Sequence, residues 1–130
     1  MTHSKNNPLL KEWVKRLGLT DWKIKLFDHC RSDEMSMGGC AGCVEYREVG
    51  KTARIDIIDE KEYGNRIVLF DYEKTLVHEL LHLKMCFLAS TEDGFGDDNI
   101  ADRMAHQLLD DIAKALVDAK RKGDHHGLQA

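Results

Sequence analysis

The sequence predicts an α+β domain: a small antiparallel or mixed sheet of three strands, covered by helices. Its 130 residues are the length of one domain, and a hydrophobic fraction of 42% with a single proline is typical of a folded chain. Strand-like periodicity fills much of residues 22–58, and two long helical patterns follow it. Strands followed by helices indicate an α+β architecture. We expect one domain over 1–122 and a disordered tail over 123–130.

The first two elements are a short helix and a strand. Asn7 followed by Pro8 is typical of a helix start, and Gly18 ends the apolar pattern that follows. We therefore expect a helix over about 8–17. Apolar and lysine residues then alternate over 22–26, which predicts a half-buried strand.

A β-hairpin is expected next. Two strand-like stretches, 43–49 and 52–58, are separated only by a glycine and a lysine, which suits a tight turn. In the second stretch the charged residues Arg54 and Asp56 alternate with apolar ones. This alternation favours an edge position in the sheet, because edge strands tolerate charged side chains. A polar loop over 59–66 follows the hairpin.

Two longer helices complete the predicted domain. Asp71 is a suitable N-cap for a helix over about 72–88, and Asp97 or Asp98 can cap a last helix over about 98–121. The apolar stripe expected on the last helix consists of Ala101, Met104, Ala105, Leu108, Ile112, Ala115, Leu116 and Ala119.

Charge and cysteine content narrow the class of protein. The net charge of −4 argues weakly against nucleic-acid binding, and no stretch approaches the 18 apolar residues of a membrane span. The first residues lack the apolar segment of a signal peptide, so we expect a cytoplasmic protein with reduced thiols. Cys40 and Cys43 have zinc-knuckle spacing without a second close pair. We interpret them as strand or core residues, with a second metal or redox site as the alternative.

The motif that carries chemistry lies inside the predicted helix over 72–88. His78-Glu79-Leu80-Leu81-His82 places two imidazoles four residues apart, on one helix face, where both can bind one ion. Zinc accepts neutral imidazole nitrogen readily. Glu79 projects about 100° around the helix from His78, so it suits a general base that acts on a zinc-bound water better than a third ligand.

The motif and its surroundings resemble the zincin metallopeptidases, in particular small single-domain members from bacteria and their phages. The resemblance rests on Thr75-Leu-Val-His-Glu-Leu-Leu-His-Leu-Lys84 and on His106-Gln-Leu-Leu-Asp-Asp-Ile-Ala-Lys-Ala-Leu116, and in layout it covers Trp22 to Leu116. It implies a minimal zincin-like fold in which the edge strand before the active-site helix binds an extended peptide by main-chain pairing. By this resemblance, 52–58 would be that strand.

A catalytic zinc needs a third protein ligand beyond the two motif histidines. We choose His106, because it lies in mid-helix, carries a preferred zinc donor and occupies the place where the resemblance implies a ligand. Asp98 and Asp102 are the alternatives. One observation opposes His106: on a helical wheel it lies about 160° from Leu108, the centre of the expected apolar stripe.

The function that these features favour is a zinc-dependent peptidase that acts on a peptide or protein substrate. Glu79 would take the proton from the zinc-bound water and pass it to the leaving amine. Tyr46, Tyr63 and Tyr72 are candidates to stabilise the oxyanion, with no preference among them. His29 could line the site. The alternative function is a zinc-binding module of zincin shape with little or no peptidase activity and a regulatory or interaction role in a phage or prophage.

Overall fold

The computed structural model describes residues 1–35, 40–64, 66, 68–86 and 100–129. It is an α+β structure, as the order of strands and helices in the sequence predicts. In chain order the elements are β1 (Thr2–Ser4), α1 (Pro8–Arg16), β2 (Lys23–Cys30), the 3₁₀ turn η1 (Ser32–Glu34), β3 (Gly42–Arg47), β4 (Thr52–Ile58), α2 (Glu60–Tyr63), α3 (Tyr72–Lys84) and α5 (Ile100–Gln129).

The sheet is mixed and has four strands, in the order β1-β2-β4-β3. β4 runs parallel to β2 and antiparallel to β3, and the hairpin expected from the sequence is the β3–β4 pair. The expectation of three strands missed β1, in which Thr2 to Ser4 pair with Asp28 to Leu26 of β2. A three-residue strand is too short to show a periodic pattern in the sequence.

The strand at 52–58 lies inside the sheet, so the expectation that it forms the edge was wrong. Arg54 and Asp56 suggested an edge, but the Arg54 Nε donates to Asp56 Oδ1 at 2.8 Å and the Arg54 guanidinium lies 4.4 Å from the ring centre of Phe27. Paired charges can be buried at much lower cost than isolated ones. The edge strand on this side of the sheet is β3.

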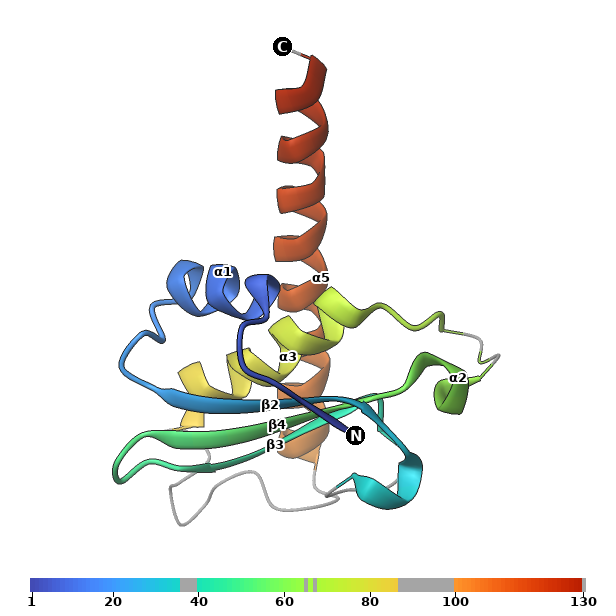
Figure 1. The fold of residues 1–130 in the computed structure, drawn as a ribbon. Helices are drawn as coiled ribbons and strands as arrows, with labels where there is room; N and C mark the ends of the chain where they lie inside the picture. Colours follow the sequence, from blue (N-terminus) through green and yellow to red (C-terminus); the bar gives the residue numbers. More distant parts are fainter. Residues whose placement is uncertain (36–39, 65, 67, 87–99, 130) are drawn as a thin grey trace.

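Helices α1 and α3 lie together on one side of the sheet, and α5 packs along α3 with its C-terminal part projecting beyond the rest of the molecule (Figure 1). The buried core lies between the sheet and these helices, which fixes α3 over β3 and β4. Its largest members are Trp13, Leu19, Leu26, Ile55, Ile57, Leu76, Val77, Leu80, Leu109 and Val117.

The helix boundaries agree with the sequence in part. Asp71 caps α3 as expected, since its side chain accepts a hydrogen bond from the Lys74 N–H at 3.1 Å. The expected loop at 59–66 contains the short helix α2. The expected cap of the last helix, at Asp97 or Asp98, lies outside the described residues.

Helix α5 differs from the expectation in its length and in its buried face. It runs to Gln129, through most of the expected tail, because a glycine such as Gly123 costs only about 1 kcal/mol inside a helix. Its buried stripe is Leu109, Ala113 and Val117, whereas Leu108 is 49% exposed.

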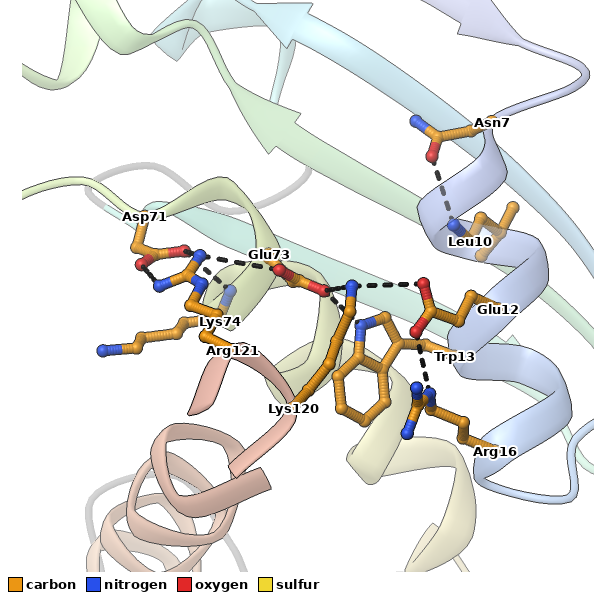
Figure 2. A network of polar contacts seen from close by, with 10 residues as sticks. All are labelled: Asn7, Leu10, Glu12, Trp13, Arg16, Asp71, Glu73, Lys74, Lys120 and Arg121. Carbon is orange, nitrogen blue, oxygen red and sulfur yellow. Dashed lines mark hydrogen bonds and ion pairs between the residues drawn. The ribbon is translucent and has the colours of Figure 1, made fainter. Parts of the chain in front are cut away.

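A polar network fixes α5 against α3 and α1 (Figure 2). The buried carboxylate of Glu73 accepts hydrogen bonds from Trp13 Nε1 at 2.7 Å and from Lys120 Nζ at 2.5 Å. Arg121 donates twice to Asp71, at 2.7 and 3.0 Å. Burial alone would raise the pKa of Glu73, but the bonds from Lys120 and Trp13 and the nearby cationic charges lower it overall. The network thereby sets the position of α5 along α3.

Candidate metal centre

Helix α3 presents the motif histidines on one side and packs its apolar residues on the others. Leu76, Val77, Leu80, Leu81 and Leu83 are all buried, and their spacing leaves His78 and His82 only partly covered. The two imidazoles stand one turn apart, with their Nε2 atoms 3.2 Å from each other. The helical placement predicted for the motif is therefore observed.

A third histidine reaches the same point from α5. The ring of His106 lies 5.8 Å from that of His78 and 4.9 Å from that of His82, measured between centroids. One ligand atom from each residue lies within 4.8 Å of the other two, and this is the one such metal-capable group found in the described part of the chain. Of the alternative ligands, Asp98 and the Asp102 side chain lie outside the described residues.

The position of His106 on α5 removes the objection raised by the helical wheel. The objection assumed that Leu108 marks the buried face. Leu109 is 3% exposed and marks it instead. His106 is three residues before Leu109 and thus about 60° from it around the helix, at the margin of the buried stripe. A side chain at that margin faces α3 without being enclosed by it.

Two of the three imidazoles are held in the neutral form. Burial lowers the pKa of His82 to about 4, with a further contribution from the charges of His78 and His106. Burial also lowers the pKa of His78, against the opposing charge of Asp110. A metal binds neutral imidazole, so both groups are in the ligand-competent state near neutral pH.

Glu79 lies beside the histidine cluster and is 6% exposed. Burial, assisted by the charge of Asp110, raises its pKa to about 8. The start of β3 comes very close to it: a Cβ built on Gly42 would lie 3.3 Å from Glu79 Oε2 and 2.7 Å from Thr75 Cγ2. The absence of a side chain at Gly42 therefore allows β3 to approach α3 at this point, a feature that sequence reasoning did not single out.

A cavity of about 1170 Å³ opens over these residues. Residues of the edge strand β3 line it together with residues of α3 and α5, which carry the histidines. A segment before α3 also lines it, in which Val68 and Leu69 are 71% and 84% exposed. The charged and polar residues of the lining are Tyr46, Tyr63, Asp71, Lys74, Thr75, His78, Glu79, His82, His106, Asp110, Asp111 and Lys114.

Asp110 is a site residue that sequence reasoning missed. Its Oδ1 lies 2.6 Å from His78 Nδ1, the ring nitrogen turned away from His82. The contact is close but lacks hydrogen-bond geometry, so His78 Nδ1 is buried without a well-formed hydrogen bond. The only available signal in the sequence was the spacing, since Asp110 follows His106 by four residues and shares its helix face.

The tyrosine candidates separate into two groups. Tyr46 and Tyr63 line the cavity, and the Tyr63 hydroxyl donates to the Val68 carbonyl at 2.9 Å. Tyr72 is not among the lining residues; its hydroxyl donates to Asp28 Oδ1 at 2.5 Å. Tyr46 is therefore the tyrosine of the lining whose hydroxyl remains a candidate for oxyanion stabilisation.

The remaining candidate residues are one histidine and two cysteines. His29 is 70% exposed, bonds through Nδ1 to Asp59 at 3.1 Å and does not line the cavity. Cys40 and Cys43 line the cavity without forming a disulfide, and neither belongs to a metal-capable group within the described ranges. Cys43 is buried in β3, as expected for a strand residue.

Across the described residues, no helix combines the length and apolar character needed to cross a membrane. Comparison with protein-family models, curated proteins and solved structures found no match to this chain.

Proposed function

We propose that this protein is a zinc-dependent peptidase with His78, His82 and His106 as the metal ligands and Glu79 as the general base. The observation that carries the proposal is the convergence of three imidazoles from two helices, with ligand atoms within 4.8 Å of one another, beside a buried carboxylate. Two of the imidazoles belong to a local motif on α3, and the third comes from α5, far along the chain. Chance spacing of histidines within one helix does not explain this grouping.

The donor set fits zinc. Zinc sites that perform catalysis use three protein ligands and leave a position open, and neutral imidazole is among the preferred donors. With Zn–N bonds of about 2.0–2.1 Å, two ligand atoms of a tetrahedral site lie about 3.3 Å apart. The 3.2 Å between the Nε2 atoms of His78 and His82 matches that separation. Bound zinc would supply Lewis acidity that polarises a carbonyl and acidifies a water molecule.

Glu79 is suited to move a proton within the site. Its carboxylate lies in the cavity, buried against β3, where water competes little with its reaction partners. We infer that Glu79 accepts a proton from the attacking water and delivers it to the nitrogen of the leaving amine, as general acid–base catalysis requires.

The substrate inferred from the site is an extended peptide bound along β3. β3 is an edge strand of the sheet, and its residues Gly42 to Val44 line the cavity. An edge strand offers main-chain hydrogen-bonding groups to an added strand, a common mode of peptide recognition. The strand at 52–58, for which the sequence suggested this role, lies inside the sheet and has neighbours on both sides, so we infer that β3 takes the role.

The test is a comparison of wild-type protein with Glu79→Gln. Zinc content is measured by elemental analysis and peptide hydrolysis by mass spectrometry of a mixed peptide library. We expect one equivalent of zinc in both proteins and cleavage only by the wild type. Zinc in both with no cleavage by either would favour the zinc-binding module, and the absence of zinc from the wild type would overturn the metal site itself.

A further inference from the structure

The ring of His78 is held between two different partners. Its Nε2 lies 3.2 Å from His82 Nε2, within the histidine cluster, and its Nδ1 lies 2.6 Å from Asp110 Oδ1. The side chain of His78 is 14% exposed, whereas that of Asp110 is 64% exposed. One nitrogen of the imidazole therefore faces the histidine cluster, and the other faces a carboxylate.

We propose that Asp110 is a positioning residue for the metal site, which orients His78 through Nδ1 and keeps Nε2 free to bind zinc. This inference rests on the proposed zinc site and extends it beyond the three ligands. A ligating imidazole needs its proton on the nitrogen that faces away from the metal, and a carboxylate at that nitrogen selects this tautomer. It also raises the donor strength of the ring.

The surroundings of His78 Nδ1 indicate that Asp110 has no substitute. The atom is buried, and none of the described residues gives it a well-formed hydrogen bond. A buried ring N–H without an acceptor costs free energy, so a nearby carboxylate on a neighbouring helix stabilises that tautomer. Asp110 is supplied by α5, four residues after His106, so one helix delivers both the third imidazole and the carboxylate.

The adjacent residue provides a matched control. Asp111 also lines the cavity and carries the same charge, but its Oδ1 accepts a hydrogen bond from Gln107 Nε2 at 3.2 Å. Asp110→Asn and Asp111→Asn each remove one negative charge from the same turn of α5. A difference between the two variants therefore measures the contact with His78 and not the general electrostatic field around a cation.

The experiment measures zinc affinity by competition with a chromophoric chelator, for wild type and both variants. We expect Asp110→Asn to bind zinc about 10–100-fold more weakly, as found when such outer partners are removed, and Asp111→Asn to change affinity less than about threefold. Equal losses in both variants, or no loss in Asp110→Asn, would overturn the inference. A wild type that binds no zinc would overturn the proposed function together with it.

A second readout separates positioning from direct ligation. Cobalt-loaded Asp110→Asn should keep the visible absorption spectrum of the cobalt-loaded wild type, because the three imidazole ligands are unchanged. An altered spectrum would make Asp110 a ligand and contradict a positioning role. Thermal melts of the metal-free variants complete the test, since a lower melting temperature in Asp110→Asn than in Asp111→Asn would assign the loss of affinity to folding.

Discussion

Gly42 of β3 lies against Glu79 of α3 so closely that a Cβ on the glycine would be 3.3 Å from the carboxylate oxygen Oε2. The same Cβ would be 2.7 Å from Thr75 Cγ2, a distance that real side chains do not adopt. The edge strand and the helix that carries the motif are thus in contact at the point where the proposed base is located.

Gly42→Ala should displace β3 or Glu79 and impair hydrolysis more than zinc binding. Inserting a methyl group into a closed contact typically costs about 1–3 kcal/mol. Because the atoms nearest to that Cβ belong to Thr75 and Glu79 and not to a histidine, we expect zinc content to be retained. Thermal melts, elemental analysis and peptide hydrolysis would be measured together.

The control for this substitution is Gly123→Ala on α5, where a Cβ would meet no atom within 4 Å. It should stabilise the protein by up to about 1 kcal/mol, since alanine is the better helix former. Unchanged stability and activity in Gly42→Ala would show that β3 and α3 are less tightly packed than described.

Glu79→Gln should stabilise the metal-free protein at neutral and mildly alkaline pH. Burial raises the folded pKa of Glu79 to about 8, above the ordinary value of 4.5. Between these values the unfolded chain releases a proton that the folded chain retains, so this group lowers stability as pH rises. Each unit of pKa difference corresponds to about 1.4 kcal/mol, which sets an upper bound of about 5 kcal/mol. Because burying the glutamine amide also costs free energy, we expect a gain of roughly 1–3 kcal/mol at pH 8.

The gain should shrink as pH falls toward 4.5 and vanish below that value, where the carboxyl group is protonated in both states. Denaturant titrations of chelator-treated wild type and variant at several pH values measure it. A constant difference across the range would indicate a packing effect in place of the titration of Glu79.

Lys120→Met should destabilise the protein by about 1–3 kcal/mol at neutral pH. Glu73 is 7% exposed, and removing one partner of a buried ion pair leaves a charge poorly compensated, although Trp13 and Arg121 remain. The folded pKa of Glu73 is lowered, so its stabilising contribution is present above about pH 4.5 and is lost as pH falls through the folded pKa. The effect of Lys120→Met should therefore diminish on acidification.

Lys122→Met is the matched control, because Lys122 is exposed two residues further along α5. It should change the free energy of unfolding by less than about 0.5 kcal/mol. Equal effects of the two substitutions, measured by urea unfolding, would contradict a specific role for the Glu73 network.

The sequence predicts the parts of the site that depend on local spacing. His78 and His82 share a face because they are four residues apart on a helix, and this holds whatever the helix packs against. Asp110 could not be assigned in this way, since its contact with His78 depends on how α5 lies along α3. The buried stripe of α5 was misplaced for the same reason. Leu108 and Leu109 are adjacent leucines, and only the packing of the helix selects which one is buried.

The edge strand was misassigned because a pattern of charges has two physical explanations. Arg54 and Asp56 alternate with apolar residues, which is typical of a strand exposed on one side. In the structure Arg54 pairs with Asp56 and covers Phe27, so the charges are satisfied inside the sheet. The periodicity of the sequence alone cannot show that Arg54 pairs with Asp56 of the same strand and packs on Phe27 of the neighbouring strand.

His106→Ala should lower zinc affinity by more than any substitution among the alternative ligands. A three-ligand site that loses an imidazole keeps only His78 and His82, and two ligands hold zinc far more weakly than three. Asp98→Ala and Asp102→Ala should retain wild-type affinity. The measurement is chelator competition at neutral pH, with circular dichroism to verify that each variant remains helical. If His106→Ala keeps wild-type affinity while an aspartate variant loses it, the third ligand comes from that aspartate and the role of His106 is limited to packing beside the cluster.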